Sequence, residues 1–259
     1  MVQLRISSFI RLLILCLIIQ GCTPSSKITY LNDSQTGEWD VSPMPPKHHL
    51  EVGDIILVRV ISRNEESNNL FNLEANTNSN NQKLTAANMY LNGFTITQEG
   101  TIDIPNVGDV FVLNQTLEEA EATISLKAEE FLINPFVIVK LANFQFTVLG
   151  EVNSPGNYPV YKEGITIYDA IAMSGGINDY GNLQKVKIVR SEKNKKKVYN
   201  IDLTSNQILT SEFFYLRNND LIYVQPLKFK GLKKSQSQLL LSVLTTFAVL
   251  FNVYLKYSE

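Results

Sequence analysis

Residues 100–141 read GTIDIPNVGDVFVLNQTLEEAEATISLKAEEFLINPFVIVKL, and this stretch decides the fold of the first half of the chain. Its opening part alternates apolar and polar residues around Gly100 and Gly108, which predicts short strands joined by tight turns. The residues expected to face inward are Ile102, Ile104, Val110 and Val112.

A helix is predicted directly after these strands. Thr116 is followed three residues later by Glu119, which is the spacing of a capping box at a helix N-terminus. Asn134 and Pro135 are expected to stop this helix before a strand at 136–141, because proline cannot continue helical hydrogen bonding. The apolar face of the helix is expected to consist of Leu117, Ala120, Ile124, Ala128 and Phe131.

The region upstream completes one α+β unit. The residues Leu50-Glu51-Val52-Gly53-Asp54 are typical of a turn, and a β-rich run follows at 55–61. Residues 62–92 are dense in Asn and Ser and are expected to form a long loop. Together these elements predict a compact unit over 47–142, preceded by a proline-containing tether at 22–46.

A second unit is predicted over 143–227. It opens with a strand at 145–149 that runs into Gly150. Pro155 and Gly156 suit the two central positions of a type II turn.

The rest of the second unit contains a short helix and a hairpin. Thr166 and Asp169 have the capping spacing, and Gly175-Gly176 would end the helix in a left-handed conformation. A hairpin with a lysine-rich tip and a final strand should follow, at 186–190, 197–202 and 221–225.

The N-terminus is typical of a secretory signal. Arg5 and Arg11 provide the positive charge, and a short apolar run at 12–19 precedes Gly21-Cys22. The small residue before the cysteine resembles a lipobox, which predicts removal of residues 1–21 and diacylation of Cys22. The alternative is an ordinary signal peptide with an accidental cysteine.

The C-terminus is a second candidate for membrane contact. After a basic linker at 228–234, an uncharged stretch begins at 235, and a helix over 235–256 would be roughly 30 Å long. Its polar residues fall within about one third of the helical wheel. A ring of such helices would line a wet channel, and the candidate lumen-facing residues are Gln238, Ser242, Thr245 and Asn252.

Composition limits the classes of function. The formal charge is −2, and nothing suggests nucleic-acid binding. After cleavage at Cys22 the chain has no cysteine left to form a disulfide. His48 and His49 lie together in a proline-rich segment without other ligands at metal spacing. We expect no metal, no cofactor and no catalytic residue, and hence no enzyme.

Several side chains have alternative interpretations. The acidic residues Glu118, Glu119 and Glu121 have the chemistry of a glycosidase pair, but acidic residues at the start of a capped helix are more typical of a solvated helix face. The lysines near 193–197 suit either an acidic polymer or a solvated hairpin tip. The tyrosines that could stack on sugars, or simply pack in the fold, are Tyr158, Tyr161, Tyr168 and Tyr180.

Two parts of the chain resemble known domains. The stretch 100–141 resembles the polysaccharide-export domain, and the residues around Gly150, Pro155-Gly156 and Gly175-Gly176 resemble the soluble-ligand-binding β-grasp (SLBB) domain. Residues 50–54 and 216–224 resemble the strand openings that recur in these domains. Asn114 and Asn219 stand where glycine is common in the family, and there is one SLBB-type unit where longer members carry two.

The order of the parts is similar to that of outer-membrane polysaccharide export lipoproteins. The resemblance implies an α+β fold, in which a small export domain precedes a β-grasp-like SLBB domain, with an N-terminal lipoprotein signal and a C-terminal membrane helix. It also implies a homo-oligomeric ring in the outer membrane, with its domains facing the periplasm. The implied partners are membrane lipid, a capsular or extracellular polysaccharide, and an inner-membrane polysaccharide co-polymerase or tyrosine kinase.

Two functions of different classes remain open. The first is a passive channel that conducts polysaccharide through the helix ring. The second is a periplasmic adaptor of a secretion complex, in which the C-terminal helix is only an anchor and crosses the inner membrane. A glycan-processing enzyme is supported only by generic carboxylates.

Overall fold

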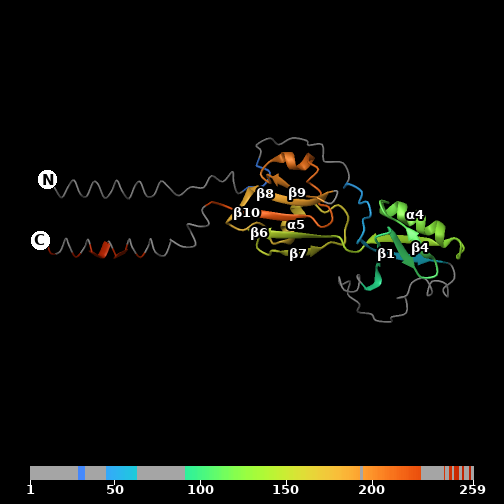
Figure 1. Cartoon of the computed structure of the whole chain (residues 1–259). Coiled ribbons are helices and arrows are strands. Elements are labelled where there is room, and N and C mark those ends of the chain that lie inside the picture. The colour runs from blue at the N-terminus through green and yellow to red at the C-terminus, as the bar shows by residue number, and fades with distance from the viewer. Residues whose placement is uncertain are drawn as a thin grey trace.

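A computed structural model describes residues 29–32, 45–62, 91–192 and 195–228, together with residues 242, 245, 246, 248–250, 253 and 257. The fold is α+β and has two hydrophobic cores, one for each half of the chain. Figure 1 shows the blue and green elements of the first domain beside the yellow and orange elements of the second.

The first domain is built on the antiparallel sheet β2-β1-β5. Its strands are β1 (Ile55–Ile61), β2 (Phe94–Thr95) and β5 (Phe136–Leu141), and a separate hairpin joins β3 (Thr101–Ile104) to β4 (Gly108–Phe111). Ile56 and Val60 of β1 and Val137 and Val139 of β5 are buried, because one face of the sheet packs toward the core and the other does not. The four predicted inward residues, Ile102, Ile104, Val110 and Val112, are all buried.

Helix α4 (Leu117–Ala128) begins with the predicted capping box, in which Thr116 and Glu119 bond each other's backbone amides. Ala120, Ile124 and Ala128 are fully buried. The prediction for Phe131 was wrong, because the helix ends at Ala128 and the chain turns before Phe131, whose side chain is exposed. Turn hydrogen bonds, rather than Asn134 and Pro135, therefore end the helix.

The second domain has a mixed five-stranded sheet in the order β7-β6-β10-β8-β9. Its last strand β10 (Leu221–Pro226) lies in the middle, parallel to β6 (Gln145–Gly150) and antiparallel to β8 (Gly181–Glu192). The edges are β7 (Gly156–Pro159) and β9 (Lys195–Ile201). The chain also forms helix α5 (Ile167–Met173) and the short 3-10 helix η2 (Asn206–Thr210).

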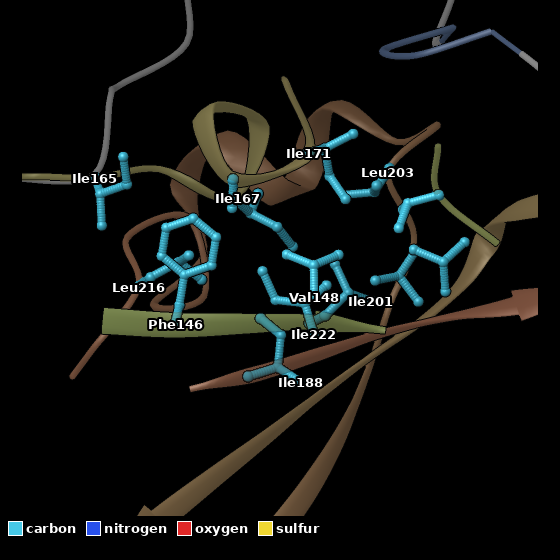
Figure 2. Close-up of a cluster of buried hydrophobic side chains, with 14 of the residues drawn as sticks. Phe146, Val148, Ile165, Ile167, Ile171, Ile188, Ile201, Leu203, Leu216 and Ile222 are labelled. Carbon is cyan, nitrogen blue, oxygen red and sulfur yellow. The ribbon is translucent and has the colours of Figure 1, made fainter. Parts of the chain in front are cut away.

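The core of the second domain lies on one face of this sheet. Figure 2 shows Phe146, Val148 and Ile222 of the strands gathered beneath Ile167 and Ile171 of α5. All five residues are buried, and burying a side chain of this size stabilises a fold by about 1.5–3 kcal/mol. The strand positions that alternate with them point to the opposite face, and none of these outward residues is buried.

One predicted turn was wrong. A type II turn with Pro155 and Gly156 at its centre requires a positive φ at the glycine. Gly156 does not have a positive φ and is already the first residue of β7, where it pairs with Val148. The left-handed residue of this connection is instead Gly150, with φ of +94°.

Candidate functional site

Two turns of the same construction open β1 and β10. In the first, Asp54 Oδ2 accepts a hydrogen bond from Glu51 N at 2.9 Å, and Asp54 N donates to Glu51 O at 3.1 Å. In the second, Asp220 Oδ2 accepts from Arg217 N at 2.8 Å, and Asp220 N donates to Arg217 O at 3.2 Å. Each aspartate thus closes its own turn just before a strand begins.

The residue before each aspartate has a left-handed backbone. Gly53 has φ of +88° and Asn219 has φ of +63°. Asn114, the other position where glycine is common, also has a positive φ of +63°. Asparagine tolerates this region better than other residues with a side chain, so both departures from the expected pattern keep the backbone shape.

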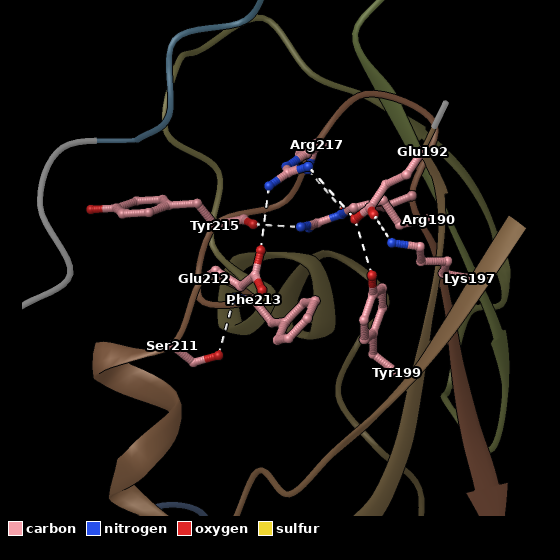
Figure 3. Close-up of polar contacts among 10 residues, drawn as sticks. Arg190, Glu192, Lys197, Tyr199, Ser211, Glu212, Phe213, Tyr215 and Arg217 are labelled. Carbon is pink, nitrogen blue, oxygen red and sulfur yellow. Dashed lines mark hydrogen bonds and ion pairs between the residues drawn. The ribbon is translucent and has the colours of Figure 1, made fainter. Parts of the chain in front are cut away.

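The second turn carries a buried ion pair. Arg190 donates from Nε to Asp220 Oδ1 at 3.0 Å and from Nη2 to Asp220 Oδ2 at 2.8 Å, and both side chains are at most 1% exposed. Nη2 also donates to Tyr215 O at 3.3 Å, and the Arg190 Cζ atom lies 5.3 Å from the centroid of the Phe213 ring. Figure 3 shows the Arg190 side chain reaching toward Tyr215, with the Phe213 ring below it in this view. Among the described residues, nothing pairs with Nη1.

A looser polar network surrounds this pair on the surface. Glu192 accepts from Lys197 Nζ at 2.6 Å and from the Tyr199 hydroxyl at 3.1 Å, and Arg217 lies 3.9 Å away. The hydrogen bond from Lys197, followed by that from Tyr199, lowers the pKa of Glu192. Because the side chains of Lys197 and Arg217 are about half exposed, their ion pairs with Glu192 add little to stability.

The first turn lies at the junction of the two domains. Asp54 Oδ1 accepts from Asn218 Nδ2 of the second domain at 3.3 Å, while Asp54 Oδ2 lies 2.6 Å from His48 Nε2. Asn218 Oδ1 in turn accepts from Gln145 N at 3.0 Å. The loop before β10 is therefore hydrogen-bonded both to its own domain and to the first one.

Asn143 makes the second link across this junction. It sits between β5 and β6, where the chain passes from one domain to the next. Its Oδ1 accepts from Ile55 N at 3.0 Å, and its Nδ2 donates to Gly53 O at 3.3 Å. The turn containing Gly53 and Asp54 thus connects the domains as well as opening β1.

Part of the predicted tether lies against the second domain. Leu31 N donates to Leu203 O at 3.2 Å, and Asn32 N donates to Thr204 O at 2.7 Å. The Tyr30 ring meets the Tyr168 ring edge-on, with centroids 6.0 Å apart. Burial raises the pKa of Tyr30, and burial followed by the nearby Tyr30 raises the pKa of Tyr168 to about 12.

The other candidate tyrosines and carboxylates are also placed. Tyr158 stacks on Phe146 at 5.5 Å between ring centroids and donates its hydroxyl to Ser154 O, whereas Tyr161 and Tyr180 are exposed. The acidic residues of α4 have structural partners: Glu119 closes the capping box, Glu118 pairs with Lys47, and Glu121 accepts from the Val139 amide of β5.

The glycines proposed as fold-defining turns differ in how strictly they are required. Gly108, Gly175 and Gly176 have φ values of +82°, +76° and +84°. Gly150 is the most constrained, because a Cβ atom added there would lie 2.1 Å from Val224 O of the neighbouring strand.

Three of the predicted membrane-related residues, Cys22, Gln238 and Asn252, lie outside the described residues. Ser242 and Thr245 are helical, and Thr245 Oγ1 donates to Ser242 O at 2.9 Å. In the described part of the chain, no helix has the length and apolar character needed to cross a membrane. The C-terminal membrane helix stays a prediction.

Sequence reasoning missed one surface. The outward face of the five-stranded sheet brings Lys187 of β8 directly opposite Tyr223 of β10. The available signal was the two-residue alternation of 185–189 and 221–225, which places Lys185, Lys187 and Tyr223 on the side away from the core. Over the residues that the structure describes, no group of three His, Cys, Asp or Glu is arranged to hold a metal ion.

Comparison with known proteins assigns both halves of the chain. Residues 42–142 match the model of the polysaccharide biosynthesis/export protein family, and residues 145–224 match the SLBB domain. The chain thus carries a domain of the polysaccharide export family followed by an SLBB domain. The two matches meet at the junction formed by Asn143, Asp54 and Asn218.

Two curated relatives carry related names. The chain is 29% identical over 96 residues to the exopolysaccharide production protein ExoF of Rhizobium meliloti (strain 1021). It is 25% identical over 138 residues to the EPS I polysaccharide export outer membrane protein EpsA of Ralstonia solanacearum. These matches cover 36% and 52% of the chain, but only 23% and 36% of the relatives' own lengths.

Proposed function

We propose that this protein is an outer-membrane lipoprotein that forms an oligomeric channel for the export of capsular or extracellular polysaccharide. The observation that carries the proposal is the pair of family matches, an export domain followed by an SLBB domain on a fold with a matching core for each. A conduit for a hydrated polymer needs a wide wet path rather than a catalytic group. In this proposal Cys22 carries the lipid, and an inner-membrane co-polymerase or tyrosine kinase is the partner.

The C-terminal helices would form the membrane-crossing part of the channel. A helix forms the hydrogen bonds of its backbone N–H and C=O groups internally, so a ring of helices can span the lipid bilayer. Gln238, Ser242, Thr245 and Asn252 would face the lumen. The hydroxyl of Thr245 donates to a carbonyl of its own helix. This hydrogen bond lowers the free-energy cost of placing the hydroxyl beside apolar side chains, and the stripe stays polar.

Replacing Gln238, Ser242, Thr245 and Asn252 together with leucine tests the channel. The helix should stay in the membrane, but surface polysaccharide should fall at least about 100-fold, because an apolar lumen no longer solvates the polymer. Surface polysaccharide is measured by immunoblotting of whole cells. The matched control exchanges the same positions for Asn, Thr, Ser and Gln, which keeps the stripe polar and should leave export unchanged.

Normal export by the leucine variant would contradict the channel and favour the alternative, a periplasmic adaptor that the helix merely anchors. Membrane fractionation distinguishes these functions further. A lipoprotein of the outer membrane should move to the inner-membrane fraction or to the soluble fraction when Cys22 is changed to Ser. An adaptor anchored in the inner membrane should keep its position.

The first domain offers a surface for assembly. Ile133 and Phe136 are 80% and 60% exposed, and the partly exposed Ile61 lies directly opposite Phe136 on the same sheet face. Exposed apolar groups that gather in this way mark interaction sites more often than isolated ones do. In a ring, these residues would pack against the neighbouring copy.

The double change Ile133→Ser and Phe136→Ser should therefore shift detergent-extracted particles from a ring toward monomers. Removing two large apolar side chains from an interface typically weakens association by several kcal/mol, so we expect at least about a 100-fold rise in the dissociation constant. Mass photometry measures the particle size. Phe111→Ser, which changes an exposed phenylalanine of the β3–β4 hairpin, is the control; rings that persist in the double variant would rule out this surface.

A further inference from the structure

The outward face of the five-stranded sheet has an unusual charge pattern. We call this surface the open sheet face and define it by the outward residues of β6, β10, β8 and β9, with Leu149, Tyr223, Lys187 and Asn200 in one row. Lys185, Lys187 and Lys196 lie on it, and none of the strand positions on this face is Asp or Glu. The face is therefore positive although the whole chain has a formal charge of −2.

Protection of a sheet edge does not account for Lys185 and Lys187. Lysine on an edge strand prevents unwanted pairing with other strands, which explains the cluster on β9. Lys187, however, is on β8, which has β10 on one side and β9 on the other. It stands directly opposite Tyr223, which lies on the central strand β10 and is 36% exposed. No ion pair involving Lys185 or Lys187 occurs within the described residues.

The chemistry of the face suits an acidic polysaccharide. An exposed tyrosine ring offers an apolar plate for the C–H face of a sugar, and the adjacent ammonium groups pair with carboxylates of uronic-acid type. Amide and hydroxyl side chains along the same face, Thr147, Asn157 and Asn200, can donate hydrogen bonds to sugar hydroxyls. From β7 to β9 the sheet is about 19 Å wide, enough for several sugar units.

We propose that the open sheet face is a binding surface for an acidic polysaccharide, with Tyr223, Lys187 and Lys185 as its main contacts. This inference rests on the proposed export function and specifies the class of its substrate. A two-fold contact with a second copy of this chain is a poorer fit, because it would place the same lysines against each other. A lipid surface is also a poorer fit, because three lysines and one tyrosine spread over β8, β9 and β10 do not form the cluster of basic residues that anionic lipids attract.

The test uses the purified full chain and two probes of matched length, oligogalacturonate and neutral dextran, with binding measured by titration calorimetry. The unmodified chain should bind oligogalacturonate more tightly than dextran, and high salt should reduce this preference. Lys185→Glu with Lys187→Glu should weaken oligogalacturonate binding at least about 10-fold, and Tyr223→Ala by about 5-fold. Lys47→Glu with Lys127→Glu has the same change in charge on the first domain and should have little effect.

Several results would overturn the inference. Unchanged oligogalacturonate binding by the Lys185 and Lys187 variant would do so, as would equal affinity for dextran. The unmodified chain could instead bind phosphatidylglycerol vesicles but not oligogalacturonate. If the Lys185 and Lys187 variant then loses the vesicle binding, the open sheet face contacts a membrane. A smaller particle size for the Lys185 and Lys187 variant than for the unmodified chain would identify the open sheet face as an interface between copies. In each case the channel proposal would still depend on the C-terminal leucine variant, so the two failures are distinguishable.

Discussion

Asp220→Asn should destabilise the protein by about 3–5 kcal/mol, although it changes one atom type at constant volume. The substitution leaves the guanidinium of Arg190 buried at 1% exposure without an anion, and an unpaired buried charge is far more costly than a broken surface pair. It also weakens the turn that precedes β10, because Asp220 Oδ2 accepts from Arg217 N. Urea unfolding followed by circular dichroism measures the loss.

The matched control is Asp54→Asn in the equivalent turn of the first domain. Asp54 closes the same kind of turn, but its neighbour His48 is partly exposed and no buried guanidinium in the described part of the chain depends on Asp54, so we expect a loss of only about 1–2 kcal/mol. Arg190→Met combined with Asp220→Leu should recover much of the stability, because a buried ion pair can often be replaced by apolar residues of similar volume. Equal losses for Asp220→Asn and Asp54→Asn would contradict the role assigned to the Arg190 pair.

Gly150→Ala should cost about 3–4 kcal/mol and prevent normal pairing of β6 with β10. Two effects combine at this position. The backbone φ of +94° is unfavourable for any residue with a side chain, and the new Cβ would lie 2.1 Å from Val224 O. That distance is far inside van der Waals contact, and the obstructing atom belongs to the backbone of the central strand.

The control for this change is Gly156→Ala at the start of β7. Gly156 has no positive φ, and the nearest atom to an added Cβ is Tyr158 Cε2 at 3.9 Å, so alanine should be tolerated within about 0.5 kcal/mol. Limited proteolysis of the second domain gives an independent readout, since an opened β6–β10 pair exposes backbone to the protease. If both alanine variants resist proteolysis equally, the steric argument for Gly150 does not hold.

Local signals explain which parts of the fold were predictable. The capping boxes at Thr116 and Thr166 involve residues only three positions apart, and both form as expected. Alternation identified the inward residues of β3 and β4 for the same reason. The prediction for Phe131 was wrong because helical periodicity indicates which side of a helix is apolar but not where the helix ends. Turn hydrogen bonds after Ala128 end the helix before Phe131.

The remaining features depend on contacts between distant residues. Asn218 and Asp54 are 164 positions apart, and nothing in either local sequence indicates that they bond. Arg190 sits at an inward position of β8, where alternation predicts burial, but its partner Asp220 is supplied by a turn 30 residues later. The open sheet face was missed because Lys187 and Tyr223 become neighbours only when β8 pairs with β10.

The contact of Tyr30, Leu31 and Asn32 with the second domain has a mechanical consequence. From Cys22 to Thr29 there are only seven residue steps, which reach at most about 25 Å when fully extended. A lipid on Cys22 would therefore keep the second domain close to the bilayer. β10 ends in this same domain, so the segment that leads to the C-terminus also departs from it. Force applied to either end of the chain would therefore reach the second domain first, and it would pass to the first domain through the chain at Asn143 and the hydrogen bonds at the junction.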